Sequence, residues 1–109
     1  MELNKYATEA ARTALFDIDS GWDYLLCSLP EEVGEFLSIF AKAARNGRAQ
    51  QLTPEEKAKA KAELGDILWN VALIARQLDT PLEHIAASNL NKLADRATRN
   101  RIEGSGDNL

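Results

Sequence analysis

Apolar residues recur at helical spacing in four stretches of the chain, and this periodicity constrains the fold more than any other feature. The stretches run from about Asn4 to Phe16, from a start between Tyr24 and Pro30 to residues 46–47, from Thr53 to about residue 78, and from Thr80 to about residue 100. The chain holds 17 Ala and 15 Leu but only 2 Val, so good helix formers dominate. We therefore predict an all-α fold, a four-helix antiparallel bundle with short connections.

Signals for the ends of these helices are strong. Thr53-Pro54-Glu55-Glu56 has the spacing of a capping box with proline at the first helical position, and Thr80-Pro81-Leu82-Glu83 starts in the same way. Gly47 suits the left-handed residue just past the end of the second helix, and Pro30 suits a first helical turn.

The length of 109 residues fits one domain, which we assign to residues 1–103. Residues 104–109 are rich in Gly, Ser, Asp and Asn and are predicted to form a flexible tail. An isolated chain of this size buries only about 60–70% of its unfolded surface, so we expect a homodimer or homotetramer.

Nothing in the sequence calls for an oxidising compartment or a membrane. The single cysteine, Cys27, cannot form an intrachain disulfide, and the longest apolar run, residues 71–75, is far too short to span a bilayer. The N-terminus has no apolar segment typical of a secretory signal. We expect a cytoplasmic protein.

The net charge of −4 arises locally. Five acids lie in two short stretches, and the rest of the chain would carry +1 without them; they are Glu31, Glu32, Glu35, Glu63 and Asp66. The acidity therefore indicates a site, and the chain has no broad basic excess that would bind nucleic acid.

The acids continue apolar helix faces. Glu32 and Glu35 share one face of the second helix, and Glu63 and Asp66 share one face of the third. Each pair alone is far more often a solvated face, but two pairs of carboxylates, each in line with a buried stripe, need a neutralising partner. Because His84 is the only histidine, a di-iron bundle is excluded, and the all-oxygen donors favour Mg²⁺ or Mn²⁺.

The fourth helix offers a complementary face. One side of this helix could hold phosphate oxygens, although the pattern alone is more often a solvated face near a helix C-terminus; its residues are Asn89, Lys92, Arg96 and Arg99. Trp22, in an irregular segment, is a candidate for stacking on a nucleobase.

Two segments carry a family resemblance. LPEEVGE at residues 29–35 and ELGDILW at residues 63–69 resemble the MazG family of all-α nucleotide pyrophosphohydrolases, whose pattern is E-E-x-x-E followed by E-x-x-D. Asn89-x-x-Lys92-Leu93-x-x-Arg96 looks like the family's C-terminal phosphate-contacting motif. The resemblance covers roughly residues 3–108.

The resemblance implies hydrolysis of a nucleoside triphosphate between its α and β phosphates, giving the monophosphate and pyrophosphate. Glu32, Glu35, Glu63 and Asp66 would then hold Mg²⁺, with Mn²⁺ as a substitute, and Glu31 would bind a second ion or activate the attacking water. Four residues would contact the substrate: Asn70, Asn89, Lys92 and Arg96.

Two other functions remain open at this point. A phosphoribosyl-ATP pyrophosphohydrolase would share the broad fold, although Gly34, Gly65 and residues 89–96 look more like the MazG pattern. A non-catalytic helical dimerisation module would bind no metal and could lose the five acids without effect.

Overall fold

The computed structural model describes residues 1–20, 22–48 and 51–103, and these residues form helices and no strand. The elements are α1 (Leu3–Arg12), the short 3₁₀ helix η1 (Ile18–Ser20), α2 (Asp23–Arg45), α3 (Pro54–Gln77) and α4 (Leu82–Glu103). The prediction of an all-α fold with four α-helices is confirmed.

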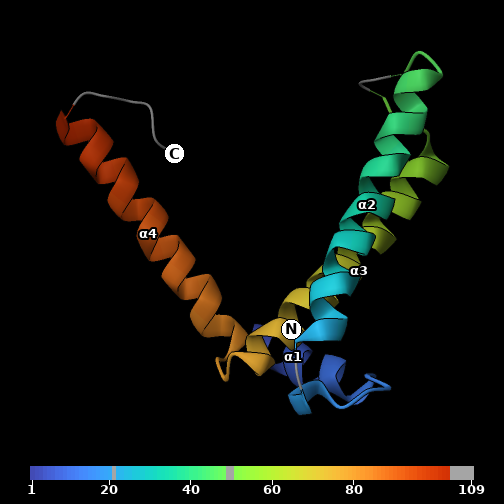
Figure 1. Cartoon of the computed structure of the whole chain (residues 1–109). Coiled ribbons are helices and arrows are strands. Elements are labelled where there is room, and N and C mark those ends of the chain that lie inside the picture. Colours follow the sequence, from blue (N-terminus) through green and yellow to red (C-terminus); the bar gives the residue numbers. More distant parts are fainter. Residues whose placement is uncertain (21, 49–50, 104–109) are drawn as a thin grey trace.

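Helices α2 and α3 form an antiparallel hairpin, the right-hand arm in Figure 1. Gly47 ends α2 with φ of +79°, and the amides of Gly47 and Arg48 donate to the carbonyls of Ala44 and Ala43, a Schellman ending. The predicted capping box of α3 forms, because Glu56 N–H donates to Thr53 Oγ1 at 3.1 Å and Thr53 N–H to Glu56 Oε1 at 2.8 Å.

An ion pair fastens this turn. The Arg48 guanidinium donates to both carboxylate oxygens of Glu56, at 2.6 and 3.0 Å. The hydrogen bond from Arg48 and that from the Thr53 backbone lower the pKa of Glu56 to about 2. The segment that follows α2 is thereby linked to the first turn of α3.

Two helix boundaries differ from the expectation. Helix α1 ends at Arg12, short of Phe16, because the Thr13 amide and hydroxyl both donate to the Ala10 carbonyl, at 3.0 and 2.7 Å. Pro30 lies in the interior of α2, so its assignment to a first turn was wrong. Proline there removes the donor for the Leu26 carbonyl, and both residues are exposed, so that water can reach this part of the helix.

The start of α4 is also different from the prediction. The Thr80 hydroxyl donates to the Leu78 carbonyl and forms no capping box. Instead Asn4, on α1, accepts from the Glu83 amide at 3.0 Å, and its Nδ2 lies 3.5 Å from Glu83 Oε2. A residue 79 positions away in the sequence therefore caps α4.

The core lies where α1, η1 and the start of α4 meet the two long helices. One cluster centres on Ile18, Leu25 and Leu73, and the half-buried Phe16 and Trp69 pack against it. A second cluster consists of Ala72, Ala75 and Leu82, flanked by Tyr6, Ala7, Val71 and Ile85. Trp69 also donates from Nε1 to Thr13 Oγ1 at 2.8 Å, so it packs at the edge of the core.

Beyond its first turns, α4 diverges from the hairpin, and the two form the arms of a V (Figure 1). The antiparallel bundle is therefore realised by α2 and α3, while α4 stands apart. The radius of gyration is 17.5 Å, whereas a compact chain of this length has about 13 Å. The chain is an open arrangement whose apolar side chains are incompletely covered.

The C-terminal tail and the absence of a membrane-spanning segment were also predicted from the sequence. The predicted tail, residues 104–109, lies outside the described residues. Within the described helices, none combines the length and apolarity that a bilayer crossing requires.

Candidate functional site

Three carboxylates from two helices meet on the hairpin. Glu32 of α2 and Glu63 and Asp66 of α3 each offer an oxygen, and these oxygens all lie within 4.8 Å of one another. Glu32 and Glu63 are half-buried and Asp66 is exposed, so the group opens to solvent on one side. The hairpin brings them together because each acid continues the apolar face through which α2 and α3 pack.

The electrostatics of this group are strained without a cation. The pKa of Glu32 is raised from 4.5 to about 7. Burial is the largest cause, and the hydrogen bond with Glu63 is the next. The negative charges of Glu35, Asp66 and Glu63 raise this pKa further. Glu32 Oε2 and Glu63 Oε2 are shielded from water, and no donor among the described residues reaches either atom. The two carboxyl groups therefore have room for one shared proton, or for a cation in its place.

The donor set fits a hard divalent ion. All three groups offer oxygen, two of them carry a buried oxygen without a donor, and one side remains accessible. These are the properties expected of carboxylates that hold Mg²⁺ or Mn²⁺ while leaving positions for water and phosphate.

The other two predicted acids lie at different distances from this group. The charge of Glu35 acts on Glu32, so Glu35 lies beside the three, although its oxygens are not among those within 4.8 Å. Glu31 is exposed and does not belong to the group. Its predicted role as a second metal ligand or base stays a prediction.

Asn70 lies one turn after Asp66 and is buried, with 1% of its surface exposed. Its Nδ2 donates to the Asp66 carbonyl at 2.9 Å, and its Oδ1 has no partner among the described residues. The Asn70 side chain therefore binds the α3 backbone beside Asp66 and is not presented to solvent. Its predicted contact with the substrate stays a prediction.

The remaining predicted substrate residues are not gathered at the acids within one chain. Asn89, Lys92 and Arg96 lie on the part of α4 that diverges from the hairpin. Trp22 is exposed and lines a cavity of about 300 Å³ with Asp19, Arg76, Gln77 and Asp79 among others, none of which belongs to the acidic group. Its base-stacking role stays a prediction.

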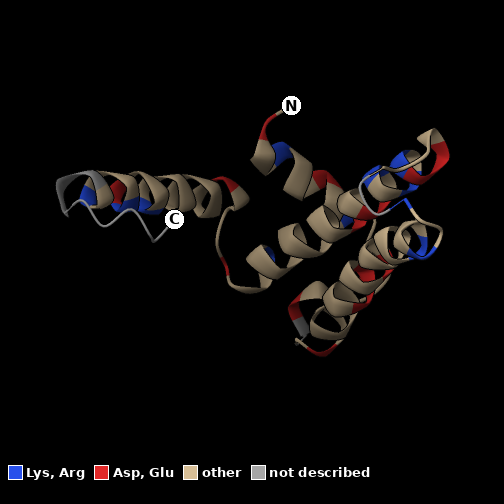
Figure 2. Cartoon of the chain, turned by 90° about the horizontal axis from the view of Figure 1, so that it is seen from above, with Lys and Arg blue, Asp and Glu red and all other residues tan. Residues whose placement is uncertain are grey.

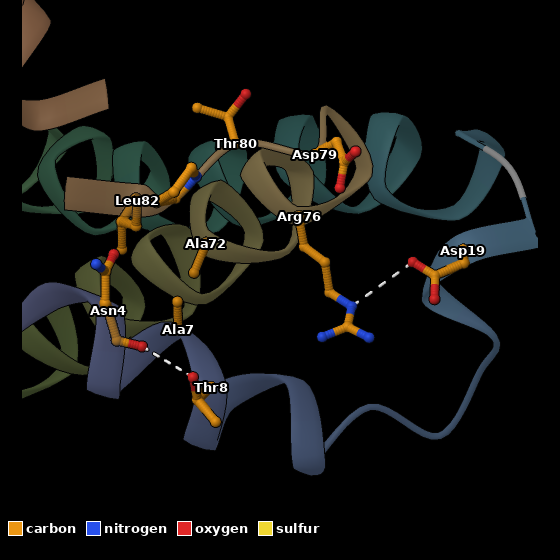
Figure 3. Close-up of a pocket in the computed structure, with 10 residues that line it drawn as sticks. Asn4, Ala7, Thr8, Asp19, Ala72, Arg76, Asp79, Thr80 and Leu82 are labelled. Carbon is orange, nitrogen blue, oxygen red and sulfur yellow. Dashed lines mark hydrogen bonds and ion pairs between the residues drawn. The ribbon is translucent and has the colours of Figure 1, made fainter. Parts of the chain in front are cut away.

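A larger cavity of about 640 Å³ lies between α1, the end of α3 and the start of α4 (Figure 3). Arg76 extends into it and pairs with Asp19 at 3.6 Å, while Asn4 and Thr8 face it from α1. The cavity contains none of the clustered acids, so its volume does not mark the acidic site.

Tyr6, on α1, is a further neighbour of the acids and was not among the predicted site residues. Its pKa is raised, chiefly by burial and further by the charge of Asp66. Its proximity to Asp66 depends on how α1 packs against α3, and no signal in the local sequence could have revealed it.

Comparison with known proteins identifies the family of the chain. Residues 6–99 match the MazG nucleotide pyrophosphohydrolase domain. The Gene 37 protein of Mycobacterium phage L5 is 39% identical over 114 residues, which cover 99% of each chain. No solved structure gives a significant match. On the extent of the domain match, the chain belongs to the MazG nucleotide pyrophosphohydrolase family.

Proposed function

We propose that this protein is a Mg²⁺-dependent nucleoside triphosphate pyrophosphohydrolase. It would cleave the bond between the α and β phosphates and release a nucleoside monophosphate and pyrophosphate. The observation that carries the proposal is the group of Glu32, Glu63 and Asp66, two of which hold a buried oxygen without a donor. Membership of the family supports the reaction class.

The carboxylates would hold Mg²⁺, which supplies charge neutralisation at the phosphates when bound. Glu32, Glu63 and Asp66 are the proposed ligands, and Glu35 is the nearest further acid. Glu31 is the candidate for a second ion or for accepting a proton from water. Water would attack the α phosphorus, the bond from that phosphorus to the bridging oxygen would break, and pyrophosphate would leave with both electrons of the bond.

The leaving pyrophosphate gains charge and needs cationic donors. Lys92 and Arg96 are four residues apart on α4, so that both can contact the same ligand. We assign them to the phosphates and Asn89 to phosphate or sugar, and Mn²⁺ is expected to replace Mg²⁺.

A nucleotide panel tests the proposal. The purified chain is incubated with all common ribo- and deoxyribonucleoside triphosphates, and with phosphoribosyl-ATP, in Mg²⁺ or in excess chelator. Pyrophosphate release from at least one triphosphate, abolished by chelation and restored by Mg²⁺, is expected. Cleavage of phosphoribosyl-ATP alone, or equal rates in chelator, would overturn the assignment.

A further inference from the structure

Two cavities meet at the end of α3, away from the acidic group. The larger, of about 640 Å³, lies between α1, α3 and α4, and the smaller, of about 300 Å³, lies beside η1 and the start of α2. Both are lined by Asp19, Arg76 and Asp79. Arg76 follows Asp66 on α3 at a distance of about 15 Å along the helix axis. Cavities of this size hold small organic molecules.

Arg76 presents hydrogen-bond donors to this space. Its Nε lies 3.6 Å from Asp19 Oδ1, and 52% of the side chain is exposed. The two Nη groups have no ion-pair partner of their own in the part of the chain that the structure describes, and Figure 3 shows them on the side away from α3. Because the two N–H groups of a guanidinium are parallel, they match two neighbouring acceptors in one plane.

Asp79 adds an acceptor that the local fold does not use. Its φ is +57°, and the amides of Asp79 and Thr80 donate to the carbonyls of Arg76 and Ala75, as in a Schellman ending. Glycine is the usual residue at this position, because a side chain disfavours positive φ. The turn needs only the backbone of Asp79, and its carboxylate forms no ion pair with any described residue. This carboxylate faces both cavities and is free to accept from a ligand.

Trp22 supplies an aromatic surface to the smaller cavity. The side chain is 42% exposed, and it is the residue that the sequence indicated for stacking on a nucleobase. An aromatic surface beside a guanidinium and a carboxylate suits a planar heterocycle, because stacking supplies affinity and the charged groups contact the edges of the ring.

The charge of this region disfavours ligands that carry phosphate. Each cavity is lined by two carboxylates and one guanidinium. The C-terminal end of α3 adds the negative end of the helix dipole. Figure 2 shows red where α3 passes into α4, and most of the blue at the far ends of the hairpin and of α4. The region therefore favours a nucleoside without phosphate over a nucleotide.

Guanine is the common base whose edges match these groups. Its O6 and N7 are neighbouring acceptors for a guanidinium, while N1–H and the N2 amino group are neighbouring donors for a carboxylate. In adenine an amino donor lies beside N7, so a guanidinium cannot contact both positions, and the pyrimidines have no N7.

We propose that Trp22, Arg76 and Asp79 form a second ligand site, separate from the acidic group, which binds the guanine base of an unphosphorylated nucleoside. The base stacks on Trp22, Arg76 donates to O6 and N7, and Asp79 accepts from N1–H and the N2 amino group. Asp19 stays the partner of Arg76 Nε and holds the guanidinium in place. The site requires neither a metal ion nor hydrolysis, so it does not depend on the proposed function.

Calorimetric titration in excess chelator tests the ligand class. Guanosine is expected to bind, and adenosine and cytidine to bind at least about tenfold more weakly, as for loss of a bidentate contact to a base. Inosine, which lacks the N2 amino group, and 7-deazaguanosine, which lacks the N7 acceptor, should also bind more weakly than guanosine. Guanosine 5′-monophosphate should do so because of its charge. Absence of guanosine binding, or equal affinities for all of these compounds, would overturn the proposal.

Asp79→Gly tests the location of the site without endangering the fold. Glycine suits the positive φ, so thermal stability should be kept or raised, while guanosine affinity should fall at least about tenfold. Trp22→Ala should also weaken binding, whereas Trp22→Phe keeps an aromatic surface and most of the affinity. Glu55→Gln, at an exposed acid on the first turn of α3, is the matched control and should bind guanosine as the parent does. Undiminished binding by Asp79→Gly would refute the site.

Two further measurements separate this site from the proposed reaction. Asp66→Asn should bind guanosine in chelator with the affinity of the parent, although its hydrolytic activity is lost. In Mg²⁺, guanosine should still bind the parent when a non-hydrolysable analogue of the hydrolysed triphosphate is present at saturation. Displacement of guanosine by that analogue would place Trp22 in the base pocket of the substrate and overturn a separate site. A chain that binds guanosine but hydrolyses no triphosphate would support this inference and refute the proposed function.

Discussion

The folded protein disfavours the ionised form of Glu32. Its folded-state pKa of about 7 lies above the ordinary 4.5, chiefly because of burial and then because of Glu63 and the neighbouring acids. A carboxyl group with a raised pKa stabilises the fold while it is protonated, and that contribution is complete below its unfolded pKa. It is lost as the pH rises through about 7.

The metal-free protein should therefore lose thermal stability between about pH 5 and about pH 8, relative to Glu32→Gln, which has no proton to lose. Mg²⁺ should restore much of the difference at the higher pH, since a ligand of the folded state stabilises it. Calorimetry of both proteins in chelator and in Mg²⁺ checks this. Parallel pH profiles for parent and variant would show that Glu32 is ionised without penalty.

Asp66 is the exposed member of the acidic group, so its replacement should leave the fold intact. Asp66→Asn keeps the shape but removes a charged ligand, and we expect kcat/KM to fall by about 100-fold or more. The circular dichroism spectrum should be unchanged, and Glu55→Gln, an exposed acid at the start of α3, should retain parent activity. A near-normal rate for Asp66→Asn would remove this residue from the metal site.

Lys92 and Arg96 carry the proposed contacts to the leaving pyrophosphate. Lys92→Ala should lower kcat/KM by an amount that corresponds to a loss of roughly 2–4 kcal/mol of transition-state stabilisation, the range for removal of one preorganised donor. We expect kcat to fall and KM to rise. Arg96→Lys should also impair the enzyme because a point charge cannot replace a forked contact. Lys59→Ala on the exposed face of α3 is the control. Rates for Lys92→Ala within about twofold of the parent would contradict the assignment.

At the scale of the elements, two similar four-residue motifs behave differently. Thr53 caps α3, while Thr80 bonds to a carbonyl and leaves the capping of α4 to Asn4. Thr53→Ala should therefore lower the free energy of unfolding by about 1 kcal/mol, and Thr80→Ala should cost clearly less. Urea unfolding of the two variants compares them, and equal losses would show that the two hydroxyls have the same role.

Helix ends that depend on nearby residues could be predicted from the sequence, and helix ends that depend on distant residues could not. Thr53, Glu56 and Gly47 act through neighbours within a few positions, so the ends of the α2–α3 turn could be predicted. The cap of α4 depends on α1, 79 positions away, and the early end of α1 at Arg12 depends on a Thr13 side chain that competes for a carbonyl. Neither effect is contained in apolar periodicity.

At the scale of the molecule, the pairing of acids across α2 and α3 followed from faces read off the sequence. Glu32, Glu63 and Asp66 meet because each continues a packed stripe. The sequence did not predict the direction of α4, because an apolar helix face has the same residue pattern whether it packs against its own chain or against another. The position of Tyr6 near Asp66 likewise depends on the packing of α1 against α3, which the sequence pattern did not predict.

The proposed function requires one chemical outcome at the acidic group, cleavage of the triphosphate between its α and β phosphates. Phosphorus NMR of the reaction with the preferred nucleoside triphosphate, followed in Mg²⁺ and in chelator, measures it directly. We predict resonances of a nucleoside monophosphate and pyrophosphate that grow together in Mg²⁺ and are absent in chelator. A nucleoside diphosphate with orthophosphate would place the attack at the γ phosphorus, and products that form without metal would contradict the role of Glu32, Glu63 and Asp66.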